Sequence, residues 1–188
     1  MISAIAAVKA INNVREEEIV VATMTANRYW ETVSDNKDLD LPIFGAMGKA
    51  SSVALGLALS QPQKKIIALD GDGSLLMILG SLVTVAGMEP NNFIHFGFED
   101  GAYWTTGGQP IPGNGKFNLS AMAEDAGYKN SHEFEDLEIL VDELPNVLNQ
   151  DGPTFVAIKV THPEHAGEPF IGSTKTAMEK LSKVISGS

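Results

Sequence analysis

Two acidic segments of the sequence each follow a short apolar run. Asp70-Gly71-Asp72-Gly73-Ser74 comes directly after residues 66–69, and Glu99-Asp100-Gly101-Ala102 comes directly after a second apolar run, residues 93–98. Carboxylate oxygens are the ligands that a hard cation such as Mg²⁺ prefers, and such a cation bridges to phosphate oxygens. The glycines on both sides of Asp72 let the backbone come close to a ligand. These residue types and their order indicate a candidate metal–phosphate site.

The elements around these segments would bring them together. Short apolar runs are typical of buried parallel strands, and the apolar segment 74–87 between the two runs predicts a helix. A strand–helix–strand crossover places the carboxyl ends of both strands at one edge of the sheet, where ligands bind in open α/β folds. A helix that begins at Ser74 would add free N–H groups and a positive dipole end for a phosphate.

Gly-Asp-Gly alone is a common turn, so the pairing of the two segments carries the prediction. The chain has no Gly-x-Gly-x-x-Gly after a strand and no Gly-Lys-Ser/Thr, which excludes the usual dinucleotide fingerprint and the P-loop. A Mg²⁺-dependent enzyme of nucleotides or other phosphates, built on a doubly wound fold, stays open as an alternative.

Helical and strand-like segments alternate along the chain, which predicts an α/β protein, a three-layer α/β/α sandwich with a mainly parallel sheet. We expect a single domain over residues 1–188, with a tail over 161–188 that is mobile or contacts a partner. The predicted helices are residues 2–13, 49–60, 74–87, 118–126, 134–148 and 176–185, and the predicted strands are 19–21, 66–69, 93–98 and 154–160. Residues 27–40 and 161–173 are read as irregular, and residues 101–115 as a long loop of the kind that is often functional.

Composition excludes several classes of function. The formal net charge of −11 would repel a phosphate backbone, so we expect no nucleic-acid partner. The chain has no cysteine, which excludes disulfides, thiolate zinc sites and thiol nucleophiles. No stretch reaches the ~18 apolar residues of a membrane span, and the N-terminus has no signal-peptide pattern, so we expect a cytoplasmic protein without membrane contact.

Further segments make the chain resemble a known family, the thiamine diphosphate (ThDP)-dependent 2-oxo-acid decarboxylases, in their diphosphate-binding domain. That family's motif is Gly-Asp-Gly followed, after a gap, by Asn at the end of the next strand; here Gly71-Asp72-Gly73 and Asp100 occupy these places. Gly45-Ala46-Met47-Gly48-Lys49-Ala50-Ser51-Ser52 and Thr106-Gly107-Gly108-Gln109-Pro110 are similar to the sulfopyruvate decarboxylase β subunit and the matching half of phosphonopyruvate decarboxylase. The resemblance covers most of residues 40–160.

The resemblance implies that the two acidic segments bind Mg²⁺ and a diphosphate. The side chains of Asp72 and Asp100 and the backbone carbonyl of Ala102 would bind Mg²⁺, and Ser74 would bond the diphosphate. Asp100 replaces the family's usual Asn, which adds about one negative charge beside the diphosphate. We therefore expect either a stronger dependence on metal or a weaker retention of ThDP. The full set of implied cofactor-binding residues is Gly45, Met47, Gly71, Asp72, Gly73, Ser74, Ala102 and Tyr103.

The segment around Met47 would contact the other end of the cofactor. The resemblance implies that Met47 supports ThDP in a folded shape and that backbone groups of Gly45 and Met47 bond its pyrimidine edge. Composition alone would make Met47 a core methionine, and its spacing to Asp72 reverses that preference. Gln109, in the long loop, is a candidate for contacting the acidic tail of the substrate. Trp104 would either narrow the entrance or pack against a partner.

In this family, activation of ThDP also needs a glutamate from a separate pyrimidine-binding domain. We expect no room for that domain in 188 residues, so the glutamate would come from an α subunit, in a hetero-oligomer. The resemblance implies decarboxylation of a short 2-oxo acid with an anionic tail, sulfopyruvate first and phosphonopyruvate second. The matching motifs offer only Lys49 and Lys116 as cations for that tail, so the partner would supply others. A non-catalytic regulatory or binding protein with the ThDP fold is an alternative.

The histidines and one acidic group have ordinary interpretations. His95 is predicted to be a buried, hydrogen-bonded core residue, and His132 a solvated one. His162 and His165 form a His-x-x-His in the tail, which either binds metal or folds over the substrate. The acidic residues predicted to share a solvated helix face are Glu133, Glu135, Asp136 and Glu138.

Overall fold

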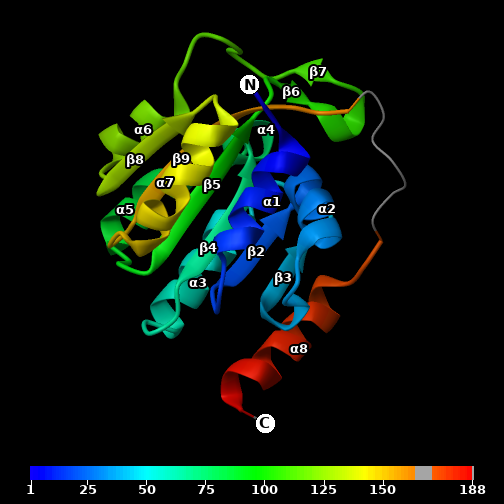
Figure 1. Ribbon diagram of the computed structural model, residues 1–188, viewed down its shortest axis with the longest axis vertical. Helices are drawn as coiled ribbons and strands as arrows, with labels where there is room; N and C mark the ends of the chain where they lie inside the picture. Colours follow the sequence, from blue (N-terminus) through cyan, green and yellow to red (C-terminus); the bar gives the residue numbers. More distant parts are fainter. Residues whose placement is uncertain (164–170, 188) are drawn as a thin grey trace.

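A parallel β-sheet forms the centre of the protein (Figure 1). The computed structural model describes residues 1–163 and 171–187. Within them the main sheet has the order β1-β9-β5-β4-β2-β3, and β8 also pairs with β9. All of these pairs are parallel. The strands are β1 (Ile2–Ser3), β2 (Ile19–Thr23), β3 (Asp40–Ile43), β4 (Ile66–Gly71), β5 (Phe93–Glu99), β8 (Asn130–Phe134) and β9 (Thr154–Thr161).

Helices cover both faces of this sheet. One face carries α1 (Ala4–Val14), α2 (Met24–Val33) and α7 (Leu137–Asn149), and the other carries α3 (Ala50–Ser60), α5 (Ser81–Met88), α6 (Leu119–Ala126) and α8 (Thr174–Ser186). The predicted α/β fold with three layers is therefore confirmed.

The strands alternate their side chains between the two cores. In β4, Ile67 and Leu69 pack with α1, α2 and α7, whereas Ile66 and Ala68 pack with the helices of the other face. Successive strand residues point to opposite faces, so a strand covered on both sides must be apolar throughout. All four side chains are fully buried, and burial of an Ile or Leu side chain contributes about 2 kcal/mol.

The strand order creates a crevice between β2 and β4. From β2 the chain runs outward to β3, and from β4 it runs to β5 on the opposite side. The helix after β2 lies on one face of the sheet, and the helices after β4 lie on the other. Because these connections diverge, the carboxyl ends of β2 and β4 stay accessible to a ligand, as at the switch point of other doubly wound sheets.

The prediction that residues 27–40 are irregular is wrong, because α2 covers residues 24–33. Its sequence contains several weak helix formers, including Thr, Asn, Tyr and Val. Its buried residues Ala26, Tyr29 and Trp30 recur at helical spacing and belong to the same core as α1. Burial of this face, rather than intrinsic propensity, stabilises the helix.

The prediction of one continuous helix over residues 74–87 is also wrong. α4 (Asp72–Leu76) is one turn long, and the N–H groups of Met77 and Ile78 bond carbonyls three residues back, as in a 3₁₀ turn. Gly80, a poor helix former, precedes α5. The turn also fits closely against Gly48, where an added Cβ would lie 2.4 Å from Ile78 Cγ2.

The predicted helix over residues 134–148 begins later than expected. Residues 130–134 form strand β8, and α7 starts at Leu137. The sequence of β8 is mostly polar and therefore has no apolar strand pattern, and its pairing with β9 stabilises it. Asp136 is the N-cap of α7: its carboxylate accepts hydrogen bonds from the N–H groups of Glu138 and Ile139.

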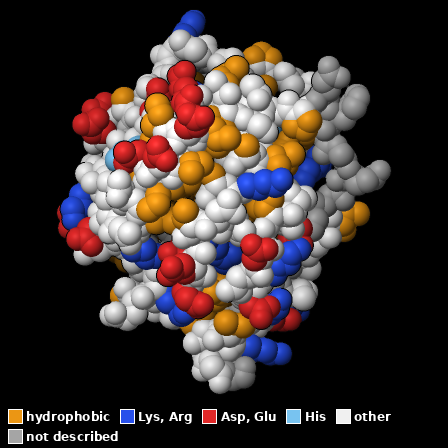
Figure 2. All heavy atoms as spheres, viewed as in Figure 1, with side chains coloured by type: hydrophobic (Ala, Val, Ile, Leu, Met, Phe, Trp, Pro, Cys, Tyr) orange, Lys and Arg blue, Asp and Glu red, His pale blue; other side chains and the backbone are white. Residues whose placement is uncertain are grey.

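The acidic residues of this region do not share one helix face. Glu133 lies in β8, where its Oε2 is 3.3 Å from Lys159 Nζ. Glu135, Asp136 and Glu138 are exposed around the start of α7, as expected for solvated charges. Figure 2 shows one group of acidic side chains at the upper left of the molecule and others lower down, among Lys and Arg side chains.

The long loop after β5 has structure of its own. It contains an antiparallel pair, β6 (Ala102–Tyr103) and β7 (Gln109–Pro110), and the short helix η2 (Trp104–Thr106). Another short helix, η1 (Lys37–Leu39), precedes β3. Across residues 1–163 and 171–187, every helix is too short or too polar to cross a membrane.

Candidate functional site

A cavity lies at the crevice between the carboxyl ends of β2 and β4. Its walls come from the start of α2, the turns after β4 and β5, and the residue that follows β9. The lining residues include Met24, Thr25, Tyr29, Met47, Gly71, Asp72, Gly73, Ser74, Asp100, Ala102, Tyr103, Trp104 and His162. Every predicted cofactor and metal residue except Gly45 therefore lines this one cavity.

Asp72 connects the two acidic segments. Its Oδ2 accepts hydrogen bonds from the N–H groups of Asp100 (3.1 Å) and Gly101 (2.8 Å), and its Oδ1 accepts one from Gly73 (2.6 Å). Asp100 Oδ1 in turn accepts the N–H of Ala102 at 3.1 Å. These bonds hold the turn after β5 against the turn after β4, as the crossover argument predicts, and they bring the two carboxylates close together.

The charges in this cavity favour a bound cation. Burial raises the pKa of Asp72 to about 7, and the charge of Asp100 acts in the same direction. Among the cavity-lining residues of the described chain, none is Lys or Arg. Two carboxylates without a cationic side chain would repel a diphosphate, unless a metal ion lay between them.

The residues present fit Mg²⁺, although they do not complete its coordination. The carboxylates of Asp72 and Asp100 and the carbonyl of Ala102 offer the hard oxygen atoms that Mg²⁺ prefers. Within residues 1–163 and 171–187, no group of three or more His, Asp or Glu side chains could hold a metal ion. Water and ligand oxygens would have to fill the rest of an octahedral shell, so metal and phosphate ligand would bind together.

Ser74 joins the Met47 segment to the turn after β4. Its Oγ accepts the N–H of Gly48 at 2.7 Å. Burial raises the pKa of the neighbouring carboxyl of Asp70 to about 6, and the Ser74 hydroxyl acts in the opposite direction. The backbone N–H of Ser74 lies in the first turn of α4, where N–H groups have no partner within the helix, so it is available to a diphosphate. Met47, next to Gly48, is held at the cavity wall.

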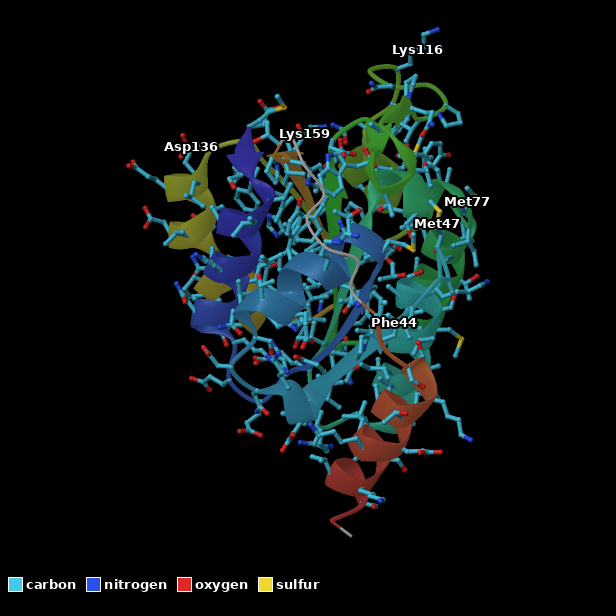
Figure 3. The ribbon with its side chains drawn as sticks, turned by 90° about the vertical axis from the view of Figure 1, so that its right-hand side faces the viewer. Phe44, Met47, Met77, Lys116, Asp136 and Lys159 are labelled. Carbon is cyan, nitrogen blue, oxygen red and sulfur yellow. The ribbon has the colours of Figure 1, made fainter. Side chains whose placement is uncertain are left out.

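At its N-terminal end, the segment around Met47 is hydrogen-bonded to the last helix, α8. The N–H of Phe44 donates to Thr174 Oγ1 at 2.9 Å, at the start of α8 (Figure 3). The next residue, Gly45, has a φ of +67°, a conformation that favours glycine. Gly45 lines a neighbouring cavity together with Arg28 and Thr105.

Tyr103 covers the turn that contains Asp72. A Cβ added at Gly73 would lie 2.7 Å from the ring of Tyr103, so glycine is required for this approach.

The helix behind the turn, α4, is only one turn long, and its dipole is accordingly weaker than that of the long helix expected from the sequence. A bound cation would therefore be the main source of attraction for a diphosphate here.

Three residues selected from the sequence lie away from the cavity. Gln109 is exposed, and its amide bonds Thr106, with Nε2 3.0 Å from the carbonyl oxygen. Lys49 and Lys116 are exposed as well, and Figure 3 shows Lys116 projecting outward from the long loop. None of the three lines the cavity.

The sequence reasoning missed Tyr29 and Arg28, because both lie on the unpredicted helix α2. Tyr29 and His162 line the cavity, and their rings stack at 5.6 Å between centroids. Trp104 also lines it, 4.9 Å from the His162 ring, and Arg28 Cζ lies 5.9 Å from the Trp104 ring. The apolar spacing of α2 is the signal that could have revealed this wall. The second histidine of the predicted pair, His165, lies outside the described residues.

The two other histidines differ in part from expectation. His95 is fully buried, as predicted, with Nδ1 3.4 Å from the hydroxyl of Tyr128. Its Nε2 has no hydrogen-bond partner in the described part of the chain and lies 4.0 Å from Asp70 Oδ2. His132 is half-buried rather than solvated, with Nε2 3.0 Å from Gln150 Oε1.

Known proteins with similar sequences share this region. The family described as thiamine pyrophosphate enzyme, C-terminal TPP binding domain, matches residues 18–158. A sulfopyruvate decarboxylase subunit beta from Methanothermobacter thermautotrophicus is 34% identical over 189 residues, covering 100% of this chain and 97% of its own length. A phosphonopyruvate decarboxylase from Streptomyces viridochromogenes is 36% identical over 165 residues, 87% of this chain. The chain spans only 41% of that second relative.

The fold also has a counterpart among solved structures. A benzoylformate decarboxylase from Polynucleobacter necessarius matches with a TM-score of 0.68 at 20% sequence identity. The match covers 84% of this chain and 33% of the other. At this identity the likeness supports the fold alone.

Proposed function

The chain belongs to the thiamine pyrophosphate enzymes, through their C-terminal TPP-binding domain, and on that premise we propose that it binds ThDP diphosphate with Mg²⁺ as one subunit of a 2-oxo-acid decarboxylase. The observation that carries this proposal is the cavity where Asp72 and Asp100 meet, which has no Lys or Arg among its described lining residues. We take residues 1–188 as one diphosphate-binding domain.

The acidic turns would bind the charged end of the cofactor. Asp72 and Asp100 would hold Mg²⁺ through carboxylate oxygens, with the Ala102 carbonyl as a further ligand. The backbone N–H of Ser74 would bond a diphosphate oxygen. The hydrogen bonds that the turn after β5 donates to Asp72 keep these groups in place before the ligand arrives, which lowers the free-energy cost of binding.

The apolar walls would serve the reacting end. Bound ThDP supplies the electron sink for loss of CO₂ from a 2-oxo acid. Met47 would support the cofactor from the wall that Gly48 and Ser74 fix. Tyr29 and Trp104 would exclude water, which strengthens electrostatic interactions in the cavity.

We propose that a second chain completes the site. Among the described residues that line the cavity there is no glutamate to protonate the aminopyrimidine, and several relatives are named as β subunits. An α subunit with a pyrimidine-binding domain would supply that glutamate. The relatives' names also support the substrate: sulfopyruvate is proposed first and phosphonopyruvate second.

Reconstitution tests this function. The chain is purified alone and together with a pyrimidine-domain chain, and CO₂ release is measured with ThDP and Mg²⁺ from sulfopyruvate, phosphonopyruvate and pyruvate. We expect turnover only with both chains, and fastest with sulfopyruvate. A pair that binds ThDP but decarboxylates none of the three acids would instead support the non-catalytic alternative.

A further inference from the structure

His162 is bonded to one of the two acidic residues of the site. It directly follows β9, and its Nε2 lies 2.9 Å from Asp100 Oδ2. Its Nδ1 lies 3.0 Å from the hydroxyl of Tyr29. The side chain of His162 is 8% exposed and that of Asp100 is 12% exposed. The interaction is therefore largely shielded from water.

The chemistry of the carboxylate fixes the direction of the first hydrogen bond. A carboxylate can only accept, so Nε2 carries a proton and donates it to Asp100. In the neutral imidazole, Nδ1 then accepts from the phenol of Tyr29. The result is a directed chain from Tyr29 through His162 to Asp100, in which every member is satisfied.

Asp100 is thereby held from two sides. Its Oδ1 accepts the N–H of Ala102, within the same turn, and its Oδ2 accepts His162, from the far end of β9. Each oxygen keeps a lone pair for a cation. With both oxygens bonded, the carboxylate has one preferred orientation, beside Asp72.

We propose that His162 is a positioning residue for the cation: it donates to Asp100 and sets that carboxylate for divalent metal binding. This inference rests on the proposed function. Partners that orient a metal-binding side chain typically change metal affinity by 10- to 100-fold when they are removed. Because the described residues that line the cavity include only two carboxylates, the orientation of each one matters more than in a site with many protein ligands.

A packing role for His162 makes a different prediction. The ring lies between Tyr29 and Trp104, with centroid distances of 5.6 and 4.9 Å. Phenylalanine would keep these ring contacts and lose the donor. Glutamine would lose the ring, but its amide nitrogen reaches the place of Nε2 and can still donate. The two substitutions therefore separate packing from hydrogen bonding.

The test measures Mn²⁺ binding, as a substitute for Mg²⁺, by electron paramagnetic resonance at a fixed, saturating ThDP concentration. The whole chain is used as wild type, His162→Phe and His162→Gln. We expect His162→Phe to weaken Mn²⁺ binding about 10-fold and His162→Gln to stay within about 3-fold of wild type. In an Asp100→Ala background, His162→Phe should have no further effect.

Thermal unfolding of the metal-free proteins provides the control. A packing role predicts that His162→Gln lowers the midpoint temperature of unfolding and the Mn²⁺ affinity more than His162→Phe does. That order of the two variants would overturn the inference. Equal Mn²⁺ affinity in wild type and His162→Phe would also overturn it, while leaving the proposed function intact. Failure of wild type to bind Mn²⁺ with ThDP would contradict the proposed function itself.

Discussion

Asp72 occupies a position where its charge is unfavourable unless a cation is present. Burial raises its pKa to about 7, and Asp100 adds like charge beside it. Three backbone N–H groups nevertheless hold the carboxylate in place. A divalent cation would favour the charged form and bring the pKa down. A buried carboxylate pair with fixed orientation is the feature expected of a binding site rather than of a structural ion pair.

The two glycines beside Asp72 allow a prediction at the level of single residues. A Cβ on Gly71 meets no atom within 4 Å, and Gly71 lines the cavity with φ −99°, which alanine also adopts. A Cβ on Gly73 would meet the Tyr103 ring. We expect Gly71→Ala to fold normally but to lose ThDP affinity, because its methyl group enters the ligand space. Gly73→Ala should lower the free energy of unfolding by about 1–2 kcal/mol. Chemical denaturation and ThDP titration measure both effects.

Gly56→Ala is the matched control for these variants. Gly56 lies in α3 with open space at its Cβ, so alanine there should stabilise the fold by up to about 1 kcal/mol without changing ThDP binding. Unchanged ThDP affinity in Gly71→Ala would contradict the placement of the ligand. Equal stability of Gly71→Ala and Gly73→Ala would contradict the close packing of Tyr103 against Gly73.

Residues of the site were predictable where they lie in short motifs. Asp72 and Asp100 each come shortly after an apolar run that predicts a strand, and Met47 lies at a recognisable spacing from Asp72. Tyr29 was not assigned to this site, and His162 was considered only as a metal ligand with His165 or as part of a tail over the substrate. The hydrogen bond between Tyr29 and His162 joins positions 133 residues apart in sequence. Only the position of α2 and the pairing of β9 with β5 bring these two together. No local pattern in the sequence encodes that approach.

At the scale of elements, the strands that helices cover on both faces of the sheet were the ones that could be predicted from the sequence. β4, β5 and β9 are central, covered on both sides and mainly apolar, so the sequence identifies them directly. β8 is mostly polar, and its backbone pairing with β9 stabilises it as a strand. α2 is stabilised by a buried face against weak propensity. Both depend on tertiary contacts that a local pattern does not contain.

The break between α4 and α5 has a consequence for the site. The turn of residues 77–80 ends α4 after one turn and lets Gly48 approach Ile78. That approach allows the hydrogen bond from Gly48 to Ser74. A continuous helix would have provided a stronger dipole for a diphosphate, so in the observed arrangement a bound metal ion would contribute a larger share of the binding.

At the scale of the whole molecule, the acidic charge would oppose the binding of an anionic cofactor without a metal ion. The chain has a formal net charge of −11, and the cavity adds two carboxylates to the field that an anionic ligand meets. A cofactor diphosphate and an anionic substrate would both be repelled at long range. Mg²⁺ in the cavity and cations from a partner chain would offset this repulsion.

Stability should depend on pH through His95. This residue is fully buried among Phe93, Phe155 and Tyr128, and burial lowers its pKa to about 3. The unfolded chain binds a proton near pH 6.5, whereas the folded chain does not, so His95 stabilises the fold above pH 6.5 and this contribution is lost as the pH falls. The loss should reach about 2 kcal/mol at pH 5. His95→Leu should reduce the difference in unfolding free energy between pH 8 and pH 5 by that amount.

Phe93→Leu controls for loss of packing near His95. It removes buried volume without a titrating group, so it should lower stability equally at both pH values. If His95→Leu kept the full pH dependence of wild type, another group would have to account for it.

The most direct test of the central claim is calorimetric titration of the isolated chain with ThDP and with ATP, each with and without Mg²⁺. The account predicts that ThDP binds only with Mg²⁺, that Asp72→Asn abolishes this binding, and that the exposed variant Asp142→Asn retains it. ATP should bind much more weakly under all conditions. Binding of ATP as tight as that of ThDP, or ThDP binding that survives Asp72→Asn, would contradict the assignment of this cavity to the diphosphate of ThDP.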